Sequence, residues 1–175
     1  MTQTEGEANH LRDLVSMVER VRDYFAGEAP RADDTRAWLS YLLVLKAIQG
    51  KLNYDISFLA CLLAKEYLSS RFDSLDWDVT ATSHGAVGLD VNVVTVGGVR
   101  IVGTVRTIIP HLRHDFDASQ MAALRRDVAR LTAVEASLKY VFLTDRRAYE
   151  LLSGPYAPAL AGVEVVLLDP FETAA

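Results

Sequence analysis

The stretch GLDVNVVTVGGVRIVGTVRT, residues 88–107, decides the fold of this chain. Aliphatic residues alternate with polar ones before and after a pair of glycines, and this alternation indicates two β-strands joined by a tight turn. If the turn held only the two glycines, Val91 would lie opposite Thr104, and each face of the sheet would mix apolar with polar side chains. A turn of three residues, 96–98, with one glycine in the left-handed conformation avoids that mixture.

The three-residue turn fixes which residues share a face of the hairpin. One face is then wholly apolar, because the turn pairs Leu89 with Val105, Val91 with Gly103 and Val93 with Ile101. The other face brings together Asp90, Thr104 and Arg106. We expect this register, because the hydrophobic pattern specifies register wherever one face of a strand is buried.

Apolar residues in the rest of the chain predict helices at both ends of the hairpin. Helical spacing predicts helices over 11–25, 35–48, 53–68, 118–131 and 146–152. Alternation with period two, or a short apolar run, predicts further strands over 77–82, 139–144 and 163–168. Asp117 and Gln120 fit a capping box at the start of the fourth helix. The helix between the last two strands indicates a parallel crossover.

From the third helix onward the predicted order begins α-β-β-β-α-β, with Asp90 on one strand of the hairpin and Thr104-Val105-Arg106 on the next. In this order and in the hairpin, the chain resembles the restriction-endonuclease-like (PD-(D/E)xK) nucleases, in which an Asp faces a Glu-x-Lys or Asp-x-Lys. The resemblance covers residues 55–168 and implies a mixed-sheet α/β (α+β) fold with an αβββαβ core. Residues 1–52 are then a helical N-terminal extension within a single domain, residues 1–175.

The resemblance assigns roles to five residues. Asp90 stands at the first carboxylate position, Thr104 at the second, and Arg106 at the lysine position. Glu66, on the third helix, stands where many members carry an additional metal ligand, so the implied metal ligands are Asp90 and Glu66. Gln120 stands where some members carry a glutamine that orients the site. From the residues alone, Glu66 could instead pair with Arg106, and the capping role suffices for Gln120.

The motif has lost groups that phosphodiester hydrolysis needs. That reaction uses a divalent ion held by at least two carboxylates, a water activated on the ion, and a lysine near that water. Thr104 offers only a neutral hydroxyl, and Arg106 cannot give up its proton to act as a base. We therefore expect a degraded site without a cofactor. An active enzyme would use Mg²⁺ or Mn²⁺ and a displaced carboxylate, for which Asp115 and Asp117 are the candidates.

A histidine-containing loop, residues 110–117, offers a different set of ligands. His111, His114 and Asp115 could bind a transition metal, with His84 as a distant fourth ligand. The sequence places no cysteine or second histidine cluster beside them, which favours a solvated loop with incidental histidines. The position of the loop next to the sheet edge would also suit contact with phosphate or substrate.

Charge is unevenly distributed along the chain. The net charge of -5 argues against a protein that binds nucleic acid non-specifically, because such proteins carry excess positive charge. Residues 97–150, however, carry nine Arg or Lys against six Asp or Glu. Such a basic face can meet phosphate, and the candidate DNA contacts are Arg100, Arg113, Arg125 and Arg126. Arginine supplies 14 of the 18 basic residues. A general bias toward arginine in the composition would also explain the excess of basic residues over 97–150, with no role in nucleic-acid binding.

The helix predicted over 35–48 is apolar nearly all round, so it should be buried by the domain or by a partner. We expect the N-terminal helices to join two copies in a homodimer. The longest apolar runs are too short to span a bilayer and the N-terminus has no apolar signal core, which favours a cytoplasmic protein without a membrane partner. The single cysteine, Cys61, lies in an apolar helical stretch and is expected to be buried.

Three functional interpretations remain open. The first is an inactive relative of the nucleases that binds double-stranded DNA or a protein partner. The second is an active Mg²⁺- or Mn²⁺-dependent deoxyribonuclease with a rearranged site that uses Glu66, Asp90 and a displaced group. The third is a homo-oligomeric assembly protein without a nucleic-acid role. The residues favour the first interpretation, and hence a protein that is not an enzyme. The resemblance implies a setting in genome defence or maintenance.

Overall fold

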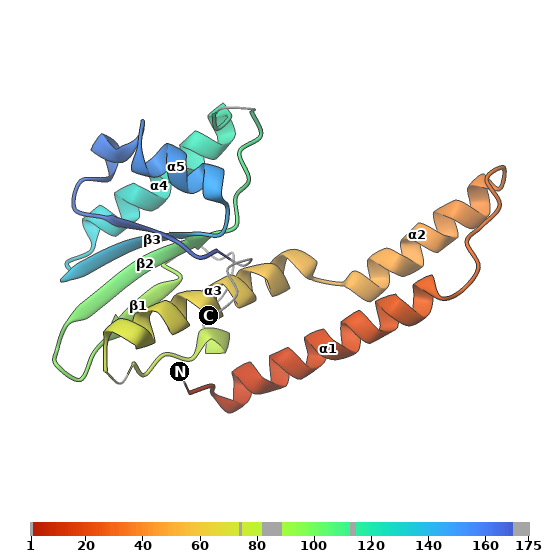
Figure 1. The fold of residues 1–175 in the computed structure, drawn as a ribbon, viewed down its shortest axis with the longest axis horizontal. Helices are drawn as coiled ribbons and strands as arrows, with labels where there is room; N and C mark the ends of the chain where they lie inside the picture. The colour runs from red at the N-terminus through yellow and green to blue at the C-terminus, as the bar shows by residue number, and fades with distance from the viewer. Residues whose placement is uncertain (1, 74, 82–88, 113–114, 170–175) are drawn as a thin grey trace. The chain divides into compact units, whose positions relative to one another are not determined.

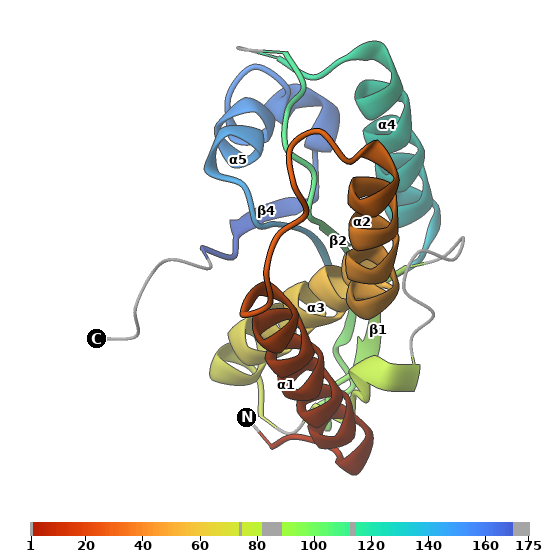
Figure 2. The same ribbon diagram turned by 90° about the vertical axis from the view of Figure 1, so that its right-hand side faces the viewer.

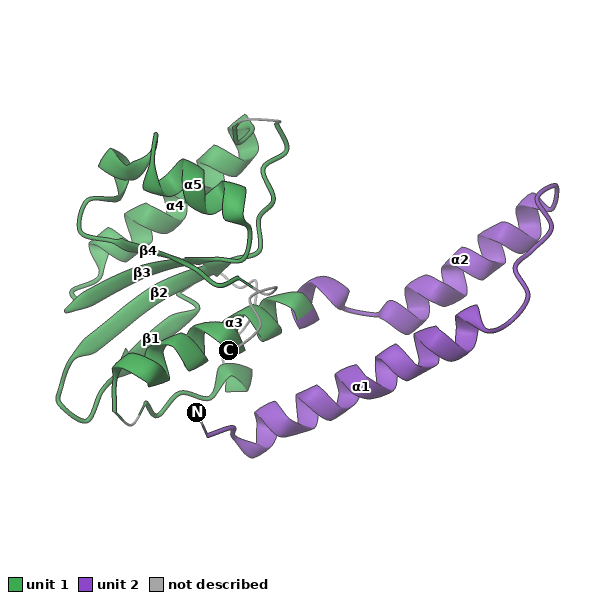
Figure 3. Cartoon of the chain, in the orientation of Figure 1, with its two compact units in different colours: residues 1, 56–175 green, residues 2–55 purple. Residues whose placement is uncertain are grey.

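The computed structural model describes residues 2–73, 75–81, 89–112 and 115–169. The chain divides into two compact units (Figure 3). Residues 2–55 form the helical unit, and residues 1 and 56–175 form the sheet unit. The boundary falls close to the end of the predicted N-terminal extension, within the first turn of helix α3 (Leu52–Arg71).

The helical unit is built from α1 (Glu5–Phe25) and α2 (Thr35–Gln49), followed by the first turn of α3. Thr4 and Glu7 form a capping box at the start of α1, which therefore begins six residues before the predicted helix. The Asp34 side chain accepts a hydrogen bond from the backbone N–H of Ala37 and caps α2. Helix α2 ends at Gln49, one residue beyond the predicted range, and is followed by Gly50, whose φ of 54° is positive.

The sheet unit contains a four-stranded mixed sheet in the order β1-β2-β3-β4. Its strands are β1 (Val91–Val94), β2 (Arg100–Arg106), β3 (Leu138–Leu143) and β4 (Glu164–Leu167). β1 and β2 are antiparallel, whereas β2, β3 and β4 are parallel, which confirms the predicted crossover. Helix α3 covers one face of the sheet, and α4 (Ala118–Ala133) and α5 (Arg146–Ser153) cover the other (Figures 1 and 2).

The register of the β1–β2 hairpin is the predicted one. Val91 pairs with Gly103, and Val93 pairs with Ile101. The backbone N–H of Thr95 donates to the carbonyl of Val99 (2.9 Å), which closes a turn of three residues, 96–98. Gly98 takes the left-handed position with a φ of 79°. The apolar pattern and the glycine pair therefore suffice to specify this hairpin.

The strand predicted over residues 77–82 is wrong as far as residue 81, and residue 82 lies outside the described residues. The chain instead forms a short 3-10 helix, η1 (Val79–Ala81). One carboxylate oxygen of Asp78 accepts hydrogen bonds from both the backbone N–H (2.9 Å) and the hydroxyl (2.6 Å) of Thr80. Trp77 and Val79 are buried nevertheless. The alternation of apolar and polar residues thus reflects burial, but the Asp78 side chain closes a local turn in place of strand pairing.

The two faces of the sheet form two layers of core. On the α4 and α5 side, Val102, Val141 and Leu143 pack in one cluster with buried residues of both helices. On the α3 side, the ring of Tyr67 lies 5.7 Å from that of Phe142. Gly103 lies on this second side, where a Cβ atom would approach the carbonyl oxygen of Tyr140 to 3.2 Å. A Cβ atom here would force neighbouring atoms of β3 to shift, so glycine suits the close approach of β2 to β3 at this point.

Candidate functional site

The hairpin brings Asp90 and Thr104 into direct contact. The Thr104 hydroxyl donates to Oδ2 of Asp90 over 2.9 Å, and the backbone N–H of Val105 donates to the same oxygen over 2.8 Å. Thr104 is buried and Asp90 is half-buried, so solvent reaches only part of this contact. The Thr104 hydroxyl thus acts as a hydrogen-bond donor to Asp90, where a carboxylate in its place could not donate.

Arg106 is held by a carboxylate from another element, Asp127 on α4. Its Nε lies 2.7 Å from Oδ2 of Asp127, and its Nη2 lies 2.6 Å from Oδ1, a bidentate pair. The Asp127 side chain is only 7% exposed. Burial alone would lower the pKa of Arg106, but hydrogen bonds to Asp127 and the charges of Asp127 and Asp90 raise that pKa above its ordinary value. The guanidinium is therefore a cation that Asp127 fixes in place and that interacts with the charge of Asp90.

Asp127 is the site residue that the sequence analysis missed. The signal was nonetheless in the sequence, because Asp127 lies three residues after Leu124 and four before Leu131, on the apolar face of α4. A carboxylate at such a position is rarely buried without a cation.

Glu66 is not brought to this site. It lies on α3, which covers the opposite face of the sheet, and its side chain is exposed. It makes no hydrogen bond or ion pair with any residue that the structure describes. The alternative pairing of Glu66 with Arg106 is replaced by the pair with Asp127. Within the described ranges, no group of three or more His, Cys, Asp or Glu side chains is arranged to hold a metal ion.

Cys61 lies on α3, which covers the other face of the sheet, and the charges of Asp90 and Arg106 influence its pKa. Its thiol is buried, as expected, at 1% exposure. Burial raises its pKa to about 12, with a further contribution from the negative charge of Asp90 and an opposing one from Arg106. A thiol with this pKa is protonated at neutral pH, so Cys61 has no nucleophilic role.

Gln120 joins the N-terminus of α4 to the segment that follows β2. Its Nε2 donates to the carbonyl of Ile109 (2.7 Å), and its Oε1 accepts from the backbone N–H groups of His111 and Asp117 (both 3.1 Å). The capping box predicted from Asp117 and Gln120 is confirmed. Gln120 is buried, so these bonds fix where the loop after β2 meets α4.

The candidate displaced carboxylates both serve the local structure. Asp117 accepts from the backbone of Gln120, the hydroxyl of Ser119 and the ring of His111, and these contacts, in that order, hold its pKa well below the usual range. Asp115 accepts from the hydroxyl of Tyr156 over 2.7 Å, a bond that raises the pKa of the tyrosine. Neither carboxylate contacts Asp90.

Other residues named from the sequence lie outside the described ranges. These residues are His84, Arg113 and His114. Of the proposed transition-metal ligands, only His111 and Asp115 therefore lie in the described part of the chain. The ring Nδ1 of His111 lies 2.6 Å from Oδ2 of Asp117. That contact gives His111 a partner within its own loop.

The outer face of α4 carries unbalanced positive charge. The helix has four charged residues: Arg125, Arg126, Asp127 and Arg130. Its one acid is turned inward to Arg106, whereas Arg125 and Arg126 are exposed and form no ion pair with a described residue. Arg100, in contrast, is held by Asn92 Oδ1 and the carbonyl of Glu135. Of the three predicted DNA contacts that the structure describes, two are therefore available to a phosphate.

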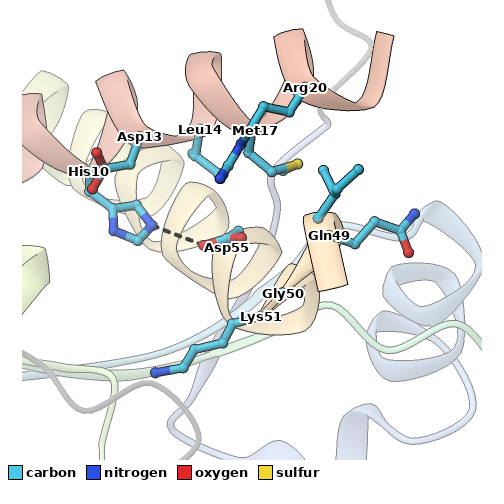
Figure 4. Close-up of a pocket in the computed structure, with 10 residues that line it drawn as sticks. His10, Asp13, Leu14, Met17, Arg20, Gln49, Gly50, Lys51 and Asp55 are labelled. Carbon is cyan, nitrogen blue, oxygen red and sulfur yellow. Dashed lines mark hydrogen bonds and ion pairs between the residues drawn. The ribbon is translucent and has the colours of Figure 1, made fainter. Parts of the chain in front are cut away.

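The helical unit has a shallow polar pocket of its own (Figure 4). His10 on α1 points toward Asp55 at the start of α3, with Nε2 3.1 Å from Oδ1. Asp13, Arg20 and Lys51 also line the pocket. The acids and bases balance one another, so the pocket does not select an anion or a cation.

The geometry around Asp90 supports charge neutralisation better than hydrolysis. Asp90 and Asp127 already accept hydrogen bonds, and Arg106, paired with Asp127, supplies positive charge close to both. Across the described part of the chain, the helices are too short or too polar to cross a membrane. Comparisons of the chain with family models, curated proteins and solved structures find no match.

Proposed function

We propose that this protein is a non-cleaving relative of the restriction-endonuclease-like nucleases that binds double-stranded DNA through α4. One observation carries the proposal: α4 turns its single acid inward, toward Arg106 and Arg130, and leaves Arg125 and Arg126 exposed. On its inner side, α4 pairs Asp127 with Arg106 and so neutralises that charge. On its outer side, α4 exposes Arg125 and Arg126.

The absence of cleavage follows from what Arg106 does. A nuclease of this class places a metal ion between its carboxylates, and here Arg106 pairs with Asp127 and interacts with the charge of Asp90. Mg²⁺ demands several oxygen ligands in near-octahedral geometry. To bind there, the ion would have to displace a bidentate pair whose acid is almost fully buried. The rearranged-nuclease interpretation is therefore the less supported one.

DNA binding rests on Arg125 and Arg126. Adjacent exposed arginines on one helix offer two guanidinium groups to successive phosphates, and arginine matches phosphate geometry through paired N–H donors. The net charge of -5 repels DNA from the rest of the surface. We therefore expect weak, strongly salt-dependent binding that depends on this face alone.

The test is a titration of a fluorescent 30-base-pair duplex with the full chain at several salt concentrations. Replacing Arg125 and Arg126 together by alanine should weaken binding at low salt about tenfold or more. It should also lower the slope of log K against log salt by roughly 2, because each of the two arginines would otherwise neutralise one phosphate. The control is Arg31→Ala with Arg36→Ala, which removes the same charge from the helical unit and should leave the slope unchanged.

The same samples answer the question of cleavage. Supercoiled and linear DNA incubated with Mg²⁺, Mn²⁺ or EDTA should remain intact in every case. Metal-dependent cutting that disappears in Asp90→Ala would overturn the proposal in favour of a rearranged nuclease. Binding that is absent at low salt, or equally weakened by both arginine pairs, would remove the assignment to α4.

A restored motif probes the relationship to nucleases. Thr104→Glu together with Arg106→Lys recreates the Glu-x-Lys pattern opposite Asp90. Gained Mg²⁺-dependent cutting, lost again on Asp90→Ala, would show that the scaffold suits this chemistry. A folded but inert double variant would show that the motif positions alone are insufficient.

A further inference from the structure

Helix α2 presents two apolar faces, and α1 covers one of them. Tyr41 lies on the covered face, with its ring 4.6 Å from that of Tyr24 on α1 and 5.8 Å from that of Trp38. The hydroxyl of Tyr24 donates to the backbone carbonyl of Tyr41 over 2.8 Å. This contact fixes which side of α2 meets α1 inside the helical unit (Figure 1).

The second face of α2 holds leucines that the structure leaves exposed. Leu39, Leu42 and Leu43 are 60%, 54% and 56% exposed. With 100° per residue, these three lie within about 100° of one another on the helix, roughly opposite Tyr41 and Leu45. No residue of α2, all of which the structure describes, is buried. A helix that is apolar on opposite sides needs cover on both.

Helix α1 adds a second exposed apolar stripe to the same unit. Val15, Val18 and Phe25 are 59%, 60% and 56% exposed, and their spacing of three and seven residues aligns them along one side of α1. Polar or charged residues occupy the remaining exposed positions of this helix. The exposed apolar residues are therefore ordered in stripes, as expected of a surface that packs on another helix.

We propose that the second face of α2 and the stripe of α1 pair with the same surfaces of a second copy of this chain, forming a homodimer through the helical units. The exposed area supports this occupant. At roughly 100 Å² for each half-exposed side chain, six side chains present on the order of 600 Å² of apolar surface per copy. A standard interface buries about 800 Å² per partner, so these residues supply its apolar centre.

A second copy also suits the chemistry of the surface. Leucine and valine stripes carry no feature that selects a particular foreign partner, but they are complementary to themselves across a two-fold axis. Lys46 lies on the same face as the leucines, seven residues after Leu39, and it can extend its ammonium to solvent while its stem packs. Nucleic acid does not fit, because the centre of the surface is apolar.

The experiment is the mass of the full chain in solution, without DNA, from about 1 to 100 μM. The chain has a mass of 19.3 kDa, and the dimer should show twice that value. Leu39→Glu with Leu43→Glu should raise the dissociation constant at least 100-fold and keep the helical circular dichroism. The control is Val96→Glu with Ile109→Glu, which alters two residues of the sheet unit that are 83% and 64% exposed. This control should remain dimeric.

A cross-linking variant keeps the proposal testable if the double substitution fails to fold. Leu43→Cys adds a thiol to the second face of α2, while the native Cys61 is buried and unreactive. A short bis-maleimide should link two Leu43→Cys chains covalently and leave the unaltered chain unlinked. A monomer at 100 μM, or a dimer that survives Leu39→Glu with Leu43→Glu, would overturn the proposal. The mass and cross-linking measurements contain no DNA, so they test the dimer separately from the proposed DNA binding.

Discussion

The sheet unit and the helical unit treat their apolar residues in opposite ways. In the sheet unit, residues of β2, β3, α4 and α5 close one core cluster in which Val102, Leu131 and Leu143 are fully buried. In the helical unit, α1 and α2 cover only one side of each other and leave leucines and valines exposed. The sheet unit therefore buries its apolar surface within itself, whereas the helical unit leaves part of its apolar surface exposed.

The ion pairs of the two units differ in the same sense, although the helical unit also buries Glu7, part of the capping box of α1. The sheet unit buries Asp127 and matches it with the bidentate Arg106. The helical unit holds ion pairs such as Arg22–Asp23 and Arg31–Asp33 at its surface, where each side chain is more than 70% exposed. Exposed pairs of this kind contribute little to stability. Substitutions should therefore cost much more in the sheet unit than in the helical unit.

The sharpest test of this difference compares two leucines. Leu131→Ala, at 0% exposure, should lower the free energy of unfolding by roughly 2–5 kcal/mol, because it leaves a cavity in the core. Leu39→Ala, at 60% exposure, should change it by no more than about 0.5 kcal/mol at low protein concentration. Urea unfolding followed by circular dichroism measures both. Equal losses would mean that the chain itself covers Leu39.

The buried ion pair gives the next largest effect. Arg106→Ala should cost about 3 kcal/mol, because it leaves the carboxylate of Asp127 buried with only Arg130 nearby, 3.5 Å away. The double variant Arg106→Met with Asp127→Leu should recover most of that loss, because an apolar pair needs no compensation. Chemical unfolding of the two variants and the parent measures the difference. A double variant no more stable than Arg106→Ala would argue against charge pairing as the cause.

The close approach of β2 and β3 should respond to a single methyl group. Gly103→Ala places a Cβ atom 3.2 Å from the Tyr140 carbonyl oxygen and 3.3 Å from Cε2 of Phe142, so we expect a loss of roughly 1–2 kcal/mol. Gly97→Ala is the matched control, because its Cβ would meet its nearest atom only at 3.8 Å. Thermal unfolding compares the two. A control as destabilised as Gly103→Ala would remove the packing explanation.

The smallest predicted effect depends on pH. The folded-state pKa of Asp117 lies below its ordinary value, so its ionised form stabilises the folded chain. This stabilisation is fully present above an ordinary aspartate pKa of about 4 and is lost as the pH falls through the lower folded-state value. Asp117→Asn should therefore lower the melting temperature more at pH 7 than at pH 3. Equal losses of melting temperature at the two pH values would argue against the ionised carboxylate as the cause.

Local features of the chain could be predicted from its sequence, and tertiary ones could not. The hairpin register follows from alternation over a few residues, and the caps at Asp117 and Gly50 follow from neighbouring residues. The strand predicted over residues 77–82 was wrong as far as residue 81, because buried and partly exposed residues alternate in this turn as they would in a strand. The pair of Arg106 with Asp127 joins residues 21 positions apart, and its partner is decided by how α4 lies on the sheet.

The burial of Cys61 has a practical consequence. A thiol at 1% exposure with a pKa near 12 reacts with an alkylating reagent only when the chain around it opens. Because it is the single cysteine of the chain, its rate of modification reports the opening of the α3–sheet layer without any engineered label. Comparison of that rate with the global unfolding rate would show whether α3 leaves the sheet separately or only with the whole unit.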